Sequence, residues 1–294
     1  MLESQGTPPE TSAVAELLAL FDLEPQSNDV FAGTSPQGAP DRLYGGQPLG
    51  QSLIAAAHTI DNEDDSEDAR PPHSLHAYFL RWGSNQLPIF YEVERLRDGR
   101  SFSARRVVAK QADKPIFVCT LSFHRPEVGY DHQTEMPKMA GPEGLPSFAE
   151  LRAHEPGDDH PMRGIEMRPV AGRAYFSDGA DAPPHLWMRS LGNVPDDPIL
   201  HQAIIAYMSD STLLSESLRP HDLNWHDPRV QTASLDHALW FHRGARIDDW
   251  LLYIQDSPSA ANGRGFCRGS LYARDGAQVA SVAQEGLVRK VEAS

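Results

Sequence analysis

The chain has 294 residues, of which 40% are hydrophobic and 23% charged, a globular composition long enough for two domains. Its formal net charge of −15 repels nucleic acid, and no basic stripe is long enough to overcome that repulsion. Two cysteines make no disulfide framework, which favours a reducing compartment. No apolar run approaches the roughly 18–20 residues of a membrane helix, and neither end of the sequence carries a secretory or peroxisomal signal pattern. We therefore expect a cytoplasmic protein with neither a membrane nor a nucleic acid as partner.

The first half of the chain indicates helices followed by a sheet. A short amphipathic helix is predicted over residues 11–23, and a second helix, entered through glycines, over 45–60. The small residues of the second helix would let a sheet approach it closely. Short turn signals separate the last three of four strand-like runs, which predicts an antiparallel meander. The runs are residues 73–81, 88–97, 101–111 and 115–124.

The middle of the chain differs in character from both halves. Residues 125–161 are rich in proline and charge and show little periodicity, which indicates a linker. The second half then repeats the plan of the first, with a long helical pattern over 196–218 and four strand-like runs. These runs are residues 231–243, 248–258, 263–274 and 277–290.

An internal repeat relates the two halves. A shift of 162 residues aligns three successive strands without a gap, although the helices do not align at that offset. The identities include Phe79 with Phe241, Arg81 with Arg243, Arg106 with Arg268 and Asp113 with Asp275. Two copies of a long helix with an antiparallel sheet predict an α+β protein. We expect one domain over 1–125, a linker over 126–160 and a second domain over 161–294.

Several familiar catalytic motifs are absent from the sequence. It contains no G-x-S-x-G elbow, no Walker loop and no H-E-x-x-H pair. The stretch GRGFCRG has the wrong spacing for a dinucleotide loop and lies in a strand pattern. Neither Cys119 nor Cys267 has the signature of a nucleophile or a zinc ligand, so both are expected in the core.

A few polar residues of the second half stand in apolar surroundings. Asp210 lies on the apolar face of the predicted helix, where a carboxylate costs free energy unless it is partnered; a solvated aspartate at a helix kink is the alternative. Gln284 lies in a strand of small and apolar residues and either serves a site or hydrogen-bonds a sheet edge. Ser234 alone would be an ordinary structural serine. Asp236 and His237 resemble a dyad, but neighbours on a strand point to opposite faces, so we expect His237 to be satisfied within the sheet.

Five motifs together resemble the acyl-CoA thioesterase II family: YGGQPLGQSL, RDGRSFSARRV, LDHALWFHR, DDWLLY and VASVAQEG. The resemblance covers nearly the whole chain outside the first ~25 residues and the linker, and it depends on all five motifs occurring in order. It implies a tandem (double) hotdog, in which each domain is a long helix wrapped by an antiparallel sheet. It also implies hydrolysis of acyl-CoA thioesters to free fatty acid and CoA without a metal, a cofactor or a covalent acyl-enzyme.

The resemblance also implies a catalytic set. The family's aspartate falls on Asp210 in YMSD, and its glutamine falls on Gln284 in VAQEG. Its threonine falls on Ser234, which keeps the hydroxyl but loses the methyl group that stiffens threonine. These three groups would hold the attacking water, and backbone N–H groups at a helix start would bind the oxyanion.

The repeat predicts a single active site per chain. The 162-residue shift places Ser122 under Gln284 and Pro72 under Ser234, and the helix predicted over 45–60 contains no carboxylate. The first domain would therefore supply part of the substrate wall, with its YGGQ turn near the thioester. Because tandem hotdog proteins commonly pair further, a homo-oligomer is expected.

Two other functions remain open from the sequence. The stretch DDPILH, residues 196–201, resembles the D-x-N-P-L-H pattern of hotdog hydratases, although its proline is displaced and the asparagine is missing. A non-catalytic protein that binds acyl-CoA is the second alternative. The basic stretch from Arg95 to Arg106 is either a solvated hairpin rim or a site for the phosphates of CoA.

Overall fold

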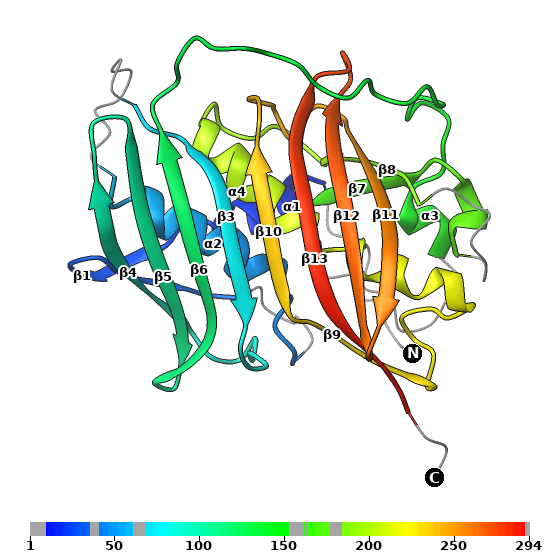
Figure 1. The fold of residues 1–294 in the computed structure, drawn as a ribbon, viewed down its shortest axis with the longest axis horizontal. Coiled ribbons are helices and arrows are strands. Elements are labelled where there is room, and N and C mark those ends of the chain that lie inside the picture. The colour runs from blue at the N-terminus through cyan, green and yellow to red at the C-terminus, as the bar shows by residue number, and fades with distance from the viewer. Residues whose placement is uncertain are drawn as a thin grey trace.

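The computed structural model describes residues 10–35, 41–60, 69–152, 162, 164–176 and 184–291. Within these residues, thirteen strands form one sheet, and helices α2 and α4 lie on one face of it (Figure 1). The first half contributes α1 (Glu10–Ala19), β1 (Glu24–Ser27), β2 (Val30–Gly33), α2 (Gly46–Ala57), β3 (Pro72–Phe79), β4 (Ile89–Asp98), β5 (Phe102–Gln111) and β6 (Lys114–His124). The second half contributes α3 (Phe148–Arg152), β7 (Ile165–Pro169), β8 (Leu186–Ser190), α4 (Pro198–Ser209), β9 (Val230–Ser234), β10 (Asp236–Phe241), β11 (Leu251–Ala261), β12 (Arg264–Ala273) and β13 (Gln278–Lys290). Short 3₁₀ helices add η1 (Gly172–Phe176), η2 (Leu213–Ser217) and η3 (Arg219–His221).

The two halves join edge to edge within the sheet. Its order is β1-β2-β4-β5-β6-β3-β10-β13-β12-β11-β8-β7, with β9 beside β13. Strands β3 and β10 pair antiparallel at the junction. The α+β prediction is confirmed, and the four strands predicted in the first half are β3 to β6. The edge strands β1, β2, β7 and β8 have only four or five residues each, too few for a periodic pattern to reveal them.

The strand registers repeat at the offset seen in the sequence. Tyr91 on β4 lies opposite Ala109 on β5, and Tyr253 on β11 lies opposite Leu271 on β12. Each residue of the second pair is its counterpart plus 162. The duplication is therefore present in the hydrogen-bonded ladder as well as in the sequence.

The repeat slips by one residue at the last strand of each half. Arg105 on β5 pairs with Leu121, whereas its counterpart on β12, Cys267, pairs with Gln284. The residue that corresponds to Gln284 in space is therefore Leu121. The ungapped sequence shift, which placed Ser122 there, was wrong by one position because nothing in an ungapped comparison records a change of pairing register.

Helices α2 and α4 pack directly against each other through glycines. A Cβ atom on Gly46 would lie 2.1 Å from the carbonyl oxygen of Tyr207, and one on Gly50 would lie 2.7 Å from that of Ala203. These glycines thus admit the backbone of another helix. The predicted approach of the sheet to the helix is also present, since α2 contacts strands β3 to β6. Because Gly46 faces Tyr207 while Gly50 faces Ala203, the helices run antiparallel. The start of α2 therefore lies beside the end of α4.

The central helix of the second half is shorter than predicted. Its first turn is capped by the side chain of Asp197, which accepts from two backbone N–H groups, and its last residue is Ser209. Four consecutive polar residues, 209–212, follow the apolar run, and such side chains compete with the helical backbone for hydrogen bonds. The rest of the predicted segment 196–218 forms the 3₁₀ helix η2. No helix among the described residues is both long and apolar enough to cross a bilayer.

The strand predicted over 231–243 is two strands. The ladder of β9 ends at Ser234, and β10 begins at Asp236 with its own register on β13. At the break, the Leu235 N–H donates to the carbonyl of Glu285, and the Glu285 N–H donates to the Asp236 carboxylate at 2.7 Å. Because of this break, Ser234 and the residues of β10 pair with β13 in different registers.

The described part of the linker leaves β6, runs past the ends of strands β10, β13 and β12, and then descends to α3 (Figure 1). Its apolar side chains, Met136, Met139 and Leu145, pack on a cluster formed by Trp187, Trp250, Leu252 and Tyr272. The Trp187 indole N–H also donates to the carbonyl of Ala140 at 2.9 Å. The linker thus covers apolar surface of the second half. Residues 153–161, at the end of the predicted linker, lie outside the described part.

Candidate active site

The three residues predicted to be catalytic lie together at the end of α4. Asp210 is the C-terminal cap of that helix, and its side chain is only 5% exposed. The Gln284 amide on β13 donates to the Asp210 carboxylate, with 2.6 Å between Nε2 and Oδ1. Ser234 ends β9 opposite Gly286, two residues beyond Gln284, and its hydroxyl lies near enough to the carboxylate to favour the ionised form. Residues separated by 24 to 74 positions in sequence therefore meet at one carboxylate.

The orientation of the Gln284 amide follows from its partner. A carboxylate only accepts hydrogen bonds when ionised, so the NH₂ group must face Asp210 and the carbonyl oxygen must point away. That oxygen, Oε1, is buried and has no hydrogen-bond partner among the described residues. A buried carbonyl without a partner carries a free-energy cost, which a hydrogen-bonded water or ligand would relieve.

The start of α2 closes the site from the other half of the chain. A Cβ atom on Gly45 would lie 2.6 Å from Asp210 Oδ2, so only glycine allows the carboxylate to approach this closely. The Gly46 N–H lies near enough to the carboxylate to favour its charge, and the Tyr44 hydroxyl donates to the carbonyl of Tyr207 at 2.7 Å. The YGGQ turn thus contacts the end of α4 directly. The positive end of the α2 dipole faces Asp210 and favours its negative charge.

Burial sets the protonation of the carboxylate. Removal from water raises the pKa of Asp210 to about 7, against the opposing effects of the hydrogen bonds from Gln284, Ser234 and Gly46 and the charge of Arg42. Both protonation states are then populated near neutral pH. A carboxylate with this pKa can take a proton from water and later return it.

His237 lies closer to this site than the sequence suggested. Its Nδ1 is 3.8 Å from Asp210 Oδ1, and its Nε2 is 2.9 Å from the Ser209 hydroxyl oxygen. Burial lowers the pKa of His237 to about 3, so the imidazole is neutral. The expectation of a satisfied histidine holds for Nε2, whereas Nδ1 has no hydrogen-bond partner among the described residues. Asp236 turns away to the Glu285 N–H, so the two neighbours form no dyad, as expected.

The other candidate functional residues from the sequence have contacts that fit a structural role. Asp197 caps α4, and His201 Nδ1 accepts from the Ile247 N–H at 3.1 Å, both toward the start of α4 and away from Asp210. Cys119 and Cys267 are buried and free, and burial raises the pKa of both thiols, which disfavours the reactive thiolate. No group of three or more histidine, cysteine or acidic side chains in the described ranges is arranged to hold a metal.

Comparison with known proteins places the chain in a family. The family model for acyl-CoA thioesterase matches residues 164–287, and the model for the acyl-CoA thioesterase N-terminal domain matches residues 33–124. A solved structure from Alicyclobacillus acidocaldarius, described as having a hot dog fold, superposes with a TM-score of 0.73 at 18% identity, covering 93% of this chain and 98% of that one. The family models and the shared fold together place the chain in the class of hotdog-fold thioesterases.

Proteins with higher sequence identity to this chain identify its family within that class. The chain is 35% identical to acyl-coenzyme A thioesterase 8 of Homo sapiens over 97% of this chain and 92% of that protein. It is 33% identical to acyl-CoA thioesterase 2 of Haemophilus influenzae over 93% and 96%, respectively. The structure of acyl-CoA thioesterase II TesB2 from Mycobacterium marinum superposes with a TM-score of 0.76 at 39% identity, covering 93% of this chain and 98% of that one. The chain belongs to the acyl-CoA thioesterase II family.

Proposed function

We propose that this chain hydrolyses acyl-CoA thioesters to free fatty acid and CoA, with Asp210 as general base and Ser234 and Gln284 positioning the water. Family membership supports the reaction. The observation that carries the assignment of residues is the 2.6 Å hydrogen bond from Gln284 to a buried carboxylate whose pKa is about 7. The buried, unpartnered Oε1 of Gln284 is a ready acceptor for one O–H of the water.

The reaction requires one proton to be moved twice. Ionised Asp210 takes a proton from the water as the oxygen attacks the thioester carbonyl carbon. The resulting oxyanion is stabilised by the positive end of the α2 dipole, which lies beside the carboxylate at Gly45 and Gly46. When the C–S bond breaks, protonated Asp210 returns the proton to the departing CoA thiolate. The balance is one water consumed and one carboxylic acid and one thiol formed, without a metal or a cofactor.

The proposal includes the domain organisation. The chain is a tandem hotdog with a first domain over 1–125, a linker over 126–160 and a second domain over 161–294, acting in the cytoplasm. Asp210, Ser234 and Gln284 all come from the second domain, whereas Gly45 and Gly46 come from the first. Each chain then has a single active site, at the interface of its two domains.

A homo-oligomer is also proposed. Tyr78 on β3 and Trp240 on β10 are 60% and 37% exposed near the junction of the two halves, and such exposed aromatics suit contact with a second copy. Sedimentation at micromolar concentration should give a mass above that of one 32.5 kDa chain. A strictly monomeric species would contradict this part of the proposal.

The decisive experiment follows free thiol release from acyl-CoAs of C4 to C18. We expect turnover by the wild-type chain and a loss on the order of 10³-fold in Asp210→Asn, since general-base catalysis contributes about 10²–10⁴-fold. A crotonyl-CoA hydration assay on the same samples tests the hydratase alternative, and CoA-thioester binding without thiol release would indicate a binding protein. Undiminished thiol release by a folded Asp210→Asn variant would refute the role of this carboxylate.

A further inference from the structure

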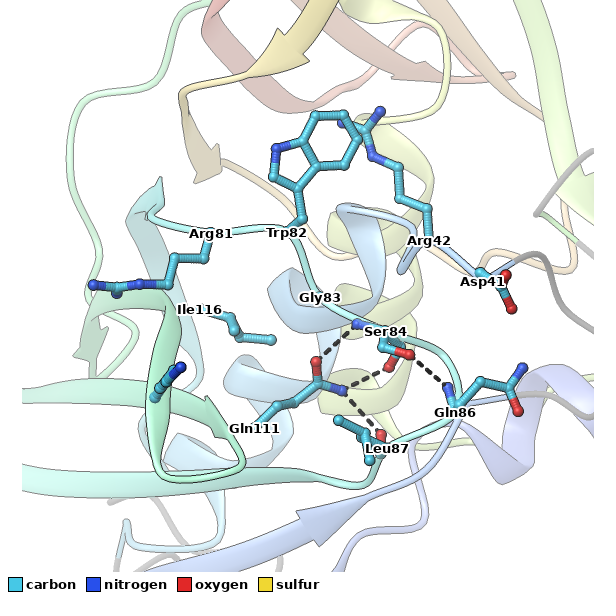
Figure 2. Close-up of a pocket in the computed structure, with 11 residues that line it drawn as sticks. Asp41, Arg42, Arg81, Trp82, Gly83, Ser84, Gln86, Leu87, Gln111 and Ile116 are labelled. Atoms are coloured by element: carbon cyan, nitrogen blue, oxygen red, sulfur yellow. Dashed lines mark hydrogen bonds between the residues drawn. The ribbon is translucent and has the colours of Figure 1, made fainter.

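A hollow of about 690 Å³ opens beside the candidate active site (Figure 2). It is lined by the segment after β3, by the segment before α2 and by the β5–β6 hairpin. Three cationic side chains, Arg42, Arg81 and Lys114, line it against one carboxylate, that of Asp41. The Arg42 guanidinium lies 3.3 Å from the ring centroid of Trp82, whose side chain is largely exposed.

The cations of the hollow differ from most others in the molecule. Arg81 donates to the carbonyl of Pro115, but none of Arg42, Arg81 and Lys114 forms an ion pair with a carboxylate within the described ranges. In a chain with 41 acidic residues and a net charge of −15, cations are expected to find acidic partners. A hollow that gathers three cations without them retains a local positive potential.

The basic stretch from Arg95 to Arg106 is largely neutralised: three of its five arginines pair with carboxylates, whereas Arg97 and Arg100 form no ion pair within the described ranges. Arg95 pairs with Asp29, Arg105 with Asp98 and Arg106 with Glu94. It also adjoins the start of β5, whereas the hollow lies at the opposite end of that strand, around Gln111 and Lys114. The sequence alone could not separate these two basic regions, because it does not show which cations are already neutralised.

Two chain segments connect the hollow to the carboxylate. Arg42 lines the hollow, and three residues later Gly45 touches Asp210, so their Cα atoms are at most about 11 Å apart. Phe79 also touches the Gly45 position, and Arg81 and Trp82 follow it into the hollow. The pantetheine arm of CoA, which separates the thioester from the phosphates, is a chain of comparable reach.

We propose that this hollow binds the nucleotide end of CoA, with Arg42, Arg81 and Lys114 holding its phosphates. The inference rests on the proposed function, since it takes the thioester to lie at Asp210. Arg42 has two partners in this arrangement: its charge favours the ionised Asp210 on one side, and it meets phosphate on the other. The stacked Trp82 indole holds the guanidinium in place.

The test compares an acyl-CoA with the matching acyl-pantetheine, which keeps the thioester and lacks the nucleotide. The readout is the ratio of kcat/KM for the two substrates in the wild type and in the double variant Arg81→Gln/Lys114→Gln. We expect the ratio to fall about tenfold, mainly through KM for acyl-CoA, since each exposed charge pair contributes only a few-fold to affinity. Arg106→Gln removes the same kind of charge from the other basic region and should leave the ratio unchanged.

The outcomes separate the inference from the proposed function. An unchanged ratio in the double variant, or a fall in Arg106→Gln instead, would overturn the nucleotide site while thioester hydrolysis stands. If neither substrate is hydrolysed, the proposed function fails, and titration calorimetry with CoA alone decides the inference. Weaker CoA binding by the double variant than by the wild type supports the site, and equal affinity overturns it.

Discussion

The two ends of the α2–α4 helix pair occupy equivalent places in the repeat but carry different chemistry. At the end of α4, Asp210 is the helix cap, with Ser234 and Gln284 from neighbouring strands. At the end of α2 the cap is His58, an exposed residue stacked on the ring of Phe31. The strand positions there are Pro72, which pairs opposite Phe123 as Ser234 pairs opposite Gly286, and Leu121 in place of Gln284.

The end of α2 also has a buried charged side chain nearby, but that side chain is extensively hydrogen-bonded. Arg105, which corresponds to Cys267, is 1% exposed and makes five hydrogen bonds, to Thr59, Asp98 and three backbone carbonyls. At the Asp210 end, by contrast, the pKa of the carboxylate is close to neutral pH. Gln284 Oε1 and His237 Nδ1 also lack hydrogen-bond partners among the described residues. The same scaffold therefore holds a fully hydrogen-bonded arginine at one end of the helix pair and an incompletely hydrogen-bonded group of polar side chains at the other.

Among the changes that contrast the two helix ends, removal of the Gln284 amide should lower kcat/KM the most. Gln284→Ala leaves Asp210 without its closest hydrogen-bond donor and the water without an acceptor, and we expect kcat/KM to fall about 10²-fold. Thiol release from one acyl-CoA measures this. His58→Ala, at the equivalent cap of α2, is the matched control and should keep wild-type kcat/KM. Equal losses in both variants would mean that the two ends are not functionally distinct.

Replacement of Arg105 should lower the stability of the fold and leave catalysis unchanged. Arg105→Met removes five hydrogen bonds and leaves the Thr59 side chain without its guanidinium partner, so we expect a loss of about 3 kcal/mol in the free energy of unfolding. Urea titration measures it, and kcat at saturating substrate should be unchanged. A large fall in kcat without loss of stability would assign this end a catalytic role.

Neutralising the Asp210 carboxylate should stabilise the fold. Burial raises the pKa of Asp210 from 3.8 to about 7, so the folded chain binds the proton more tightly and stability is lost as pH rises through that window. Asp210→Asn escapes this loss, and we expect it to be about 2 kcal/mol more stable than wild type at pH 8, below the ceiling of about 4 kcal/mol for three pH units. The difference should vanish below about pH 4. Urea titrations at both pH values would show it, and a variant less stable at pH 8 would contradict the raised pKa.

The pH profile of the wild-type enzyme should report the same group. Because only ionised Asp210 can take a proton from water, kcat/KM should rise about tenfold per pH unit below the pKa of about 7 and level off above it. Stopped-flow thiol detection between pH 5 and 9 measures the profile. A flat profile across that range would exclude a general base with this pKa.

The hydroxyl of Ser234 should have the smallest effect. Ser234→Ala removes one of the polar groups that favour the ionised carboxylate, and we expect about a tenfold loss in kcat/KM, equivalent to roughly 1.4 kcal/mol. Ser234→Thr keeps the hydroxyl and restricts χ1, so its kcat/KM should stay within about threefold of wild type. A Thr variant as impaired as the Ala variant would show that the site has no room for the methyl group.

Much of the architecture follows from local sequence pattern. The strands β3 to β6 and β11 to β13 and the offset of 162 could be predicted because alternation and turn residues act over short stretches of chain. The candidate residues Asp210, Ser234 and Gln284 were also found from the sequence, through motifs and the resemblance that they carry. The place where α4 ends could not be predicted from the apolar run alone, because it depends on the competition between side-chain and backbone hydrogen bonds at 209–212.

The amino-acid sequence by itself determined the repeated strand pattern, the α+β class and the residue types available for catalysis, since these depend on neighbours in the chain. Only the tertiary structure decided that Leu121 and not Ser122 corresponds to Gln284, that His237 approaches Asp210, and that glycines 45, 46 and 50 admit the second helix. Only it showed which arginines are neutralised and which remain free around the hollow. The physical reason is common to all of these: pairing register, burial and charge partners are set by residues brought together from distant parts of the chain.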